Sequence, residues 1–155
     1  MTSMNAAEVP WHAAFPSLKR QEPETMTRGE VLKMMKEDKI VAGKDYLLVD
    51  LRRNDHQGGT IRDSINIPAQ SLYPALPTVY NMVKAAGIRR VIWYCSSSRG
   101  RGTRAACWFG DYLEEKGDTS TQSLILLEGV KGWAKGGTEY IEYIDGYDHA
   151  YWESQ

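Results

Sequence analysis

The sequence is short of cysteine, of long apolar runs and of net charge. Two cysteines in 155 residues, Cys95 and Cys107, cannot build a disulfide framework or a cysteine zinc cage, and a reducing compartment suits them. The formal net charge of -1 argues against nucleic acid or acidic membranes as partners. No apolar run approaches the roughly 20 residues that span a membrane, and the N-terminus lacks the basic and apolar blocks of a secretory signal. We therefore expect a cytoplasmic protein, with the nucleus as the alternative location.

The chain length predicts a single domain with its own hydrophobic core. Residues 1–23 are polar and proline-containing without a periodic pattern, so we expect a weakly ordered leader there. The catalytic domain should occupy residues 24–136. Residues 137–155 form a C-terminal extension with four tyrosines and no regular pattern, which suggests packing against the domain or a homodimer contact before a ligand site. Monomer and homodimer both stay open.

Strand and helix patterns alternate from residue 27 onward. Thr27 and Glu30 have the spacing of a capping box, which predicts a short helix after them. Two prolines, Pro74 and Pro77, should interrupt the next helix early. Apolar runs predict buried strands at 46–49, 90–94 and 124–127, a shorter strand around Ile61, Ile65 and Ile67, and helices at 71–84 and 103–116. This alternation indicates an α/β fold with a mostly parallel central sheet and helices on both faces.

The strongest chemical signal is the loop from Cys95 to Arg101, which joins the strand at 90–94 to the next helix. Backbone amides of a loop built from small residues can turn inward and, with a helix N-terminus, form a nest for an oxyanion. A cysteine thiolate at the base of this nest is a nucleophile. The guanidinium of an arginine at the other end of the loop can hold two oxygens of the anion. We predict that Cys95 and Arg101 are catalytic. The predicted oxyanion-binding residues are Ser96, Ser97, Ser98, Arg99 and Gly100.

Other candidate residues carry weaker signals. Cys107 lies mid-helix among apolar neighbours and is expected in the core. Asp50 and Arg52, at the end of a strand, are predicted to support the loop through a salt bridge, with a solvated pair as the alternative. His56 is expected to be an exposed loop residue rather than a general acid. The three histidines lie far from both cysteines in sequence, so we expect no metal site.

Three segments carry a family resemblance. Residues 95–105 resemble the active-site loop of Cdc25 phosphatases and of the small fungal arsenate reductases related to them. Asp50-Leu-Arg52 and residues 59–68 resemble the rhodanese signature upstream of the catalytic strand, and residues 127–133 resemble its closing segment. The resemblance covers about Thr27 to Gly136 and implies a rhodanese-like single domain.

The loop differs from the corresponding loops of the families it resembles at positions that bear on the reaction. Sulfurtransferases of this superfamily typically have a loop one residue shorter, which would place Gly100 where Arg101 is needed, so sulfur transfer is a minority interpretation. Tyr94 stands where Cdc25-type loops usually have histidine. None of the loop residues 96–100 is acidic, whereas Cdc25 carries glutamates there, so Asp55 or the substrate would have to supply a proton to a leaving group.

The resemblance implies an arsenate reductase in which Cys95 attacks arsenic, with glutathione and a glutaredoxin as external reductants and no bound cofactor. The alternative is a protein tyrosine or dual-specificity phosphatase of the Cdc25 type, which would form a phosphocysteine intermediate. A rhodanese-like binding module without turnover is a third interpretation, less favoured because Cys95 and Arg101 are both present.

Overall fold

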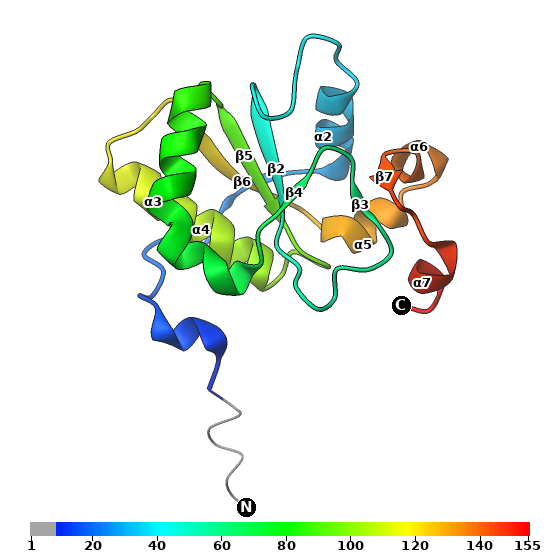
Figure 1. Cartoon of the computed structure of the whole chain (residues 1–155), viewed down its shortest axis with the longest axis horizontal. Coiled ribbons are helices and arrows are strands. Elements are labelled where there is room, and N and C mark those ends of the chain that lie inside the picture. The colour runs from blue at the N-terminus through cyan, green and yellow to red at the C-terminus, as the bar shows by residue number, and fades with distance from the viewer. Residues whose placement is uncertain (1–8) are drawn as a thin grey trace, which may run out of the picture.

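The structure, a computed structural model, describes residues 9–155. Its centre is a five-stranded sheet in the order β1-β6-β5-β2-β4 (Figure 1). All neighbouring strands in it run parallel. The strands are β1 (Glu24–Met26), β2 (Tyr46–Asp50), β4 (Ile65–Asn66), β5 (Arg90–Tyr94) and β6 (Gln122–Leu126). The predicted α/β fold with a parallel central sheet is confirmed.

Helices cover both faces of this sheet, as the sequence predicts (Figure 1). On one face lie α3 (Ala69–Ala86) and α4 (Arg101–Glu115), and on the other lie α2 (Arg28–Met35) and α5 (Gly129–Ala134). The predicted capping box is present at the start of α2, where Thr27 Oγ1 accepts from the Glu30 amide at 3.1 Å and Glu30 Oε1 accepts from the Thr27 amide at 2.9 Å. No helix within residues 9–155 combines the length and apolarity needed to cross a membrane.

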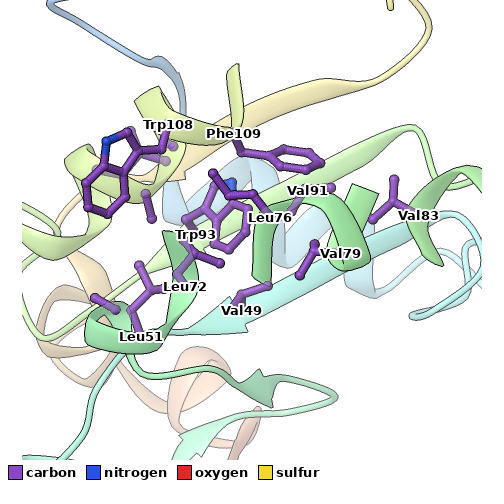
Figure 2. Packing of buried hydrophobic residues seen from close by; sticks show 14 of the residues in the cluster. Val49, Leu51, Leu72, Leu76, Val79, Val83, Val91, Trp93, Trp108 and Phe109 are labelled. Carbon is purple, nitrogen blue, oxygen red and sulfur yellow. The ribbon is translucent and has the colours of Figure 1, made fainter. Parts of the chain in front are cut away.

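The alternation of side chains along β5 divides the core into two halves. Trp93 and Cys95 face the half under α3 and α4, whereas Ile92 and Tyr94 face the half under α2 and α5. Figure 2 shows the first half, in which side chains spaced three or four residues apart on α3 pack against the strands. Trp93 meets Phe109 of α4 edge to face, with ring centroids 5.5 Å apart. Cys95 therefore leaves the sheet from a rigidly packed strand.

The predicted interruption of α3 by its prolines is wrong, because the helix runs unbroken from Ala69 to Ala86. Pro74 and Pro77 lie on its exposed side. The carbonyls of Gln70 and Tyr73 lose their helical donors there, while five buried residues anchor the opposite face of the helix. These are Ala69, Leu72, Leu76, Val79 and Val83.

The described part of the N-terminal leader packs against α4, in contrast to the expected weak order. A short 3-10 helix, η1 (Trp11–Ala14), is followed by Phe15, and both Trp11 and Phe15 contact Trp108 edge to face. Trp108 Nε1 donates to the Pro16 carbonyl at 3.2 Å. Aromatic contacts thus order a segment that was expected to be weakly ordered because it is polar and has no periodic pattern. Residues 1–8, also part of the predicted leader, lie outside the described residues.

The C-terminal extension is regular, unlike the sequence-based expectation. It contains α6 (Thr138–Ile141), β7 (Ile144–Asp145) and α7 (His149–Glu153), which lie beside α5 in Figure 1. Strand β7 pairs antiparallel with β3 (Thr60–Ile61), so the short strand expected near Ile61 is divided between β3 and β4. Ile144 and Trp152 are buried in the second half of the core.

Candidate active site

The loop from Cys95 to Arg101 links the carboxyl end of β5 to the first residue of α4. Cys95 is 3% exposed. The Ser98 amide donates to Cys95 Sγ at 3.2 Å, and Ser98 Oγ accepts from the Cys95 amide at 3.4 Å. Ser98 adopts a left-handed conformation with φ of 63°, which folds the loop back over the sulfur.

Contacts on the outside of the loop fix the direction of its peptide groups. The carbonyls of Cys95 and Ser96 accept from the amides of Val130 and Lys131, at 3.1 and 2.9 Å, in the first turn of α5. The Ser98 carbonyl accepts from Thr103 Oγ1 at 2.9 Å. Because the amide of a trans peptide points away from its carbonyl, the N–H groups of the residues that follow are turned to the opposite side of the loop. Those amides belong to Ser96, Ser97 and Arg99, three of the predicted oxyanion-binding residues.

Arg101 is held by a carboxylate from a distant part of the chain. Its two terminal nitrogens donate to the two oxygens of Asp55 at 2.8 and 2.5 Å. This pairing raises the pKa of Arg101, and the charge of the nearby Cys95 adds to the effect although burial opposes it. Arg101 is therefore bound to Asp55 and close enough to Cys95 for the charge of the cysteine to act on it.

The pairing of Asp55 with Arg101 also affects whether Asp55 can donate a proton. The hydrogen bonds from Arg101 lower the pKa of Asp55 to about 2, against the opposing effect of burial. An acid this strong is ionised near neutral pH and holds no proton to deliver. While it is paired with Arg101, Asp55 orients the guanidinium rather than acting as a general acid.

Asp50 and Arg52 form a buried ion pair beneath the segment that carries Asp55. Their side chains are 0% and 1% exposed, and Arg52 donates to both carboxylate oxygens of Asp50 at 2.8 to 3.2 Å. The remaining donors of Arg52 bind the carbonyls of Gln57 at 2.8 Å and Gly59 at 2.7 Å. Within residues 9–155, no hydrogen bond joins this pair to residues 95–100. The pair thus supports the site through residues 53–59.

Tyr94 lies on the far side of the strand from Cys95. Its hydroxyl bonds Ser64 Oγ at 2.7 Å and Thr60 Oγ1 at 2.9 Å, and it accepts from the Ile61 amide at 3.2 Å. Burial, together with the nearby Asp50 carboxylate, raises the pKa of Tyr94. A neutral hydroxyl therefore completes the polar network around Asp50, and Tyr94 does not face the oxyanion loop.

Two further residues lie where the sequence places them. Cys107 is fully buried in α4, and burial raises the pKa of its thiol. His56 is about one-third exposed, with Nε2 3.4 Å from Asp50 Oδ2. Within residues 9–155, no three His, Cys, Asp or Glu side chains lie close enough together to hold a metal ion.

Sequence reasoning missed the partners that the fold brings to the loop. The pairing of Asp55 with Arg101 has no sequence signal, because 46 positions separate the two residues. Gly129 did carry a sequence signal, because a glycine between Glu128 and Val130 allows another backbone segment to approach closely. A Cβ at Gly129 would overlap the carbonyl oxygens of Cys95 and Ser96.

Comparison with known proteins agrees with this geometry. The family model described as Rhodanese-like domain matches residues 27–136. The chain is 30% identical over 97 residues to Arsenical-resistance protein 2 of Saccharomyces cerevisiae, an alignment that covers 58% of this chain and 75% of that protein.

Solved structures with the same fold include two proteins of named activity. A yeast protein tyrosine phosphatase of the rhodanese family has a TM-score of 0.68 at 20% identity, over 86% of this chain and 99% of that one. The As-Sb reductase of Leishmania major has a TM-score of 0.62 at 18% identity, over 69% and 73% of the two chains. Likeness at these identities establishes the fold alone, whereas the match over residues 27–136 establishes the family. The chain belongs to the rhodanese-like domain family.

Proposed function

We propose that this protein is an arsenate reductase in which Cys95 is the nucleophile and Arg101 binds the oxyanion. The observation that carries the proposal is the Ser98 amide, which donates to Cys95 Sγ at 3.2 Å in a loop that has no acidic residue and ends at Arg101, itself held by Asp55. The similarity to a protein named for arsenical resistance supports arsenate as the substrate. More coarsely, the family and the site support a cysteine enzyme that acts on a small oxyanion.

The site has the donors that an oxyanion needs. Arg101 has five N–H groups and gives two of them to Asp55, so three stay available for the anion. The first turn of α4 contains no acidic residue, and the N-terminus of a helix favours negative charge. The amides of Ser96, Ser97 and Arg99 complete the proposed nest.

The proposed reaction is a series of thiol substitutions at arsenic. The Cys95 thiolate forms a sulfur–arsenic bond, and one arsenate oxygen leaves as water with two protons. A glutathione thiolate then forms a second sulfur–arsenic bond and displaces another oxygen as water. A glutaredoxin thiolate attacks the glutathione sulfur, so a disulfide forms, that sulfur–arsenic bond breaks, and its electron pair reduces As(V) to As(III). Hydrolysis of the last sulfur–arsenic bond releases arsenite and regenerates Cys95.

External thiols are required because the site offers no second cysteine. Cys107 is fully buried in the middle of α4, and its raised pKa keeps the thiol protonated. A protonated, inaccessible thiol is a poor nucleophile. The second and third thiols of the reaction therefore come from outside the chain, in accord with glutathione and a glutaredoxin as reductants.

The second candidate, a Cdc25-type phosphatase, is supported by the phosphatase of the same fold. A phosphatase has to protonate the departing alcohol or phenol. Among residues 9–155, the only carboxylate bound to Arg101 is that of Asp55, which is ionised. Arsenate carries hydroxyl groups of its own that can supply protons to the departing water. The missing acid therefore favours arsenate over a phosphomonoester.

Two assays on one preparation of the protein test the substrate. We expect arsenate-dependent NADPH oxidation in the presence of glutathione, glutaredoxin and glutathione reductase, with little hydrolysis of an aryl phosphate. Arg101→Lys should raise the KM for arsenate about tenfold or more, because lysine cannot bind two oxygens in a fixed fork. Hydrolysis without NADPH oxidation would make the protein a phosphatase, and inactivity in both assays would favour a binding module.

A further inference from the structure

Ser98 has a backbone conformation that its residue type disfavours. Its φ of 63° lies in the left-handed region, which glycine adopts freely and a residue with a side chain adopts only at a cost in free energy. The residue is also only 5% exposed. A strained, buried residue inside a candidate active site points to a use for its side chain, because glycine would otherwise fit this position without strain.

Ser98 faces Cys95 with both its backbone and its side chain. Its amide donates to Cys95 Sγ at 3.2 Å, and its Oγ accepts from the Cys95 amide at 3.4 Å. A hydroxyl also has a proton of its own to donate. Among the hydrogen bonds of Ser98 within residues 9–155, none gives this proton an acceptor. A negatively charged sulfur on Cys95 is the acceptor that the pairing of the two residues offers.

The first turn of α4 holds Ser98 in this place. A Cβ at Gly102 would lie 3.1 Å from Ser98 Cβ and 3.2 Å from Ser98 Oγ, so the glycine leaves the space that the serine side chain fills. The Ser98 carbonyl accepts from Thr103 Oγ1 at 2.9 Å. Contacts with two successive residues of α4 therefore fix both the side chain and the backbone of Ser98 beside the sulfur.

We propose that Ser98 is a catalytic residue whose hydroxyl donates a hydrogen bond to Cys95 Sγ as this sulfur leaves arsenic. In that step water forms a bond to arsenic and gives a proton to the solvent. The sulfur–arsenic bond breaks, and its electron pair stays on the sulfur as a thiolate. Hydrogen bonds to ionised groups are stronger than those to neutral groups, so the hydroxyl favours departure of the sulfur. The release of arsenite rests on the proposed function, but the departure of sulfur from a bound arsenical does not.

The departure of the sulfur can be measured without arsenate turnover. Dimethylarsinous acid forms one bond to a single thiol with loss of water, so it loads Cys95, while Cys107 is fully buried. Excess glutathione then takes up the arsenic and leaves the Cys95 thiolate, and intact-protein mass spectrometry follows the loss of the adduct. We expect Ser98→Ala and Ser98→Gly to slow this release about tenfold or more, as for loss of a hydrogen bond to a charged group.

Two further variants separate the hydroxyl from other effects. Ser71→Ala removes an exposed hydroxyl outside the loop and should leave the release rate unchanged. Gly102→Ala displaces the Ser98 hydroxyl without removing it and should slow release as well. Because glycine adopts the left-handed conformation freely, slow release in Ser98→Ala alone would assign the effect to strain and overturn the proposal. Unchanged release in both Ser98 variants would overturn it too.

The same preparations separate this inference from the proposed function. Slow release in both Ser98 variants, with no arsenate reduction by the unaltered protein, would support the role of Ser98 and remove the reductase. Arsenate reduction with unchanged release in the variants would do the reverse. An unaltered protein whose Cys95 takes up no dimethylarsenic group would overturn both.

Discussion

At the scale of single residues, the buried pair of Asp50 and Arg52 should dominate the stability of the site. Asp50→Asn leaves a buried guanidinium without its counter-charge, and loss of one member of such a pair costs about 3–5 kcal/mol. Urea unfolding of the variant should show a loss of this size in the free energy of unfolding. The matched control is Asp145→Asn, because Arg62 and Asp145 form an exposed pair at 3.2 Å that should contribute no more than about 1 kcal/mol. Equal losses in the two variants would contradict the buried role of Asp50.

The pairing of Asp55 with Arg101 makes a prediction about pH. The pKa of Asp55 is lowered from 3.8 to about 2, so the stability that the pair contributes is present above about pH 3.8 and is lost as the pH falls through about 2. Because Asp55 is 40% exposed, this contribution should be below about 1 kcal/mol. NMR titration of the Asp55 carboxyl should show a midpoint near 2 that moves back toward the ordinary value in Arg101→Lys. A midpoint at the ordinary value in the unaltered protein would rule out the pairing in solution.

At the scale of elements, the contact between α5 and the loop should be intolerant of a side chain at Gly129. Its φ is 61°, and an added Cβ would overlap the carbonyls of Cys95 and Ser96. We expect Gly129→Ala to destabilise the fold by about 2–4 kcal/mol through backbone strain and overpacking and to abolish the binding of inorganic phosphate, an arsenate analogue. Gly87→Ala has a similar φ of 74° and open space around it, so it should cost only about 1–2 kcal/mol. Phosphate affinity that survives Gly129→Ala would show that α5 does not shape the nest.

Elements that depend on nearby sequence were predictable, and those that depend on distant partners were not. The capping box of α2 and the succession of β5, loop and α4 follow from adjacent residues. In contrast, β1 has only three residues and exists through its parallel pairing with β6, about 100 positions away. Strands β3 and β7 have two residues each and depend on each other in the same way.

At the scale of the whole molecule, the C-terminal extension stabilises the segment that carries Asp55. Trp152 is 7% exposed, and its Nε1 donates to the Gly58 carbonyl at 2.7 Å. Trp152→Ala should cost about 3–5 kcal/mol in unfolding free energy by leaving a cavity in the second half of the core. Trp152→Phe keeps most of the apolar contact and should cost about 1–2 kcal/mol. Thermal and urea unfolding measure both, and a neutral Trp152→Ala would mean that the extension does not pack on the domain in solution.

Some features of the site follow from the sequence, and others depend on the fold. Cys95, Arg101 and the residues between them form one continuous loop, so their proximity could be predicted from spacing alone. Asp55 and Lys131 reach the loop from β2 and α5, on either side of it, and only the order of strands in the sheet brings them there. The sequence therefore predicted the proposed nucleophile and the proposed oxyanion loop, whereas the carboxylate that binds Arg101 emerged from the fold.

The central claim is that Cys95 is the nucleophile toward arsenate. Its most direct test is arsenate-dependent NADPH oxidation by Cys95→Ser and Cys107→Ser beside the unaltered protein. We predict that Cys95→Ser loses at least about a thousandfold in kcat, as expected for removal of a nucleophile, while Cys107→Ser keeps most of the activity. Full activity in Cys95→Ser would contradict the account.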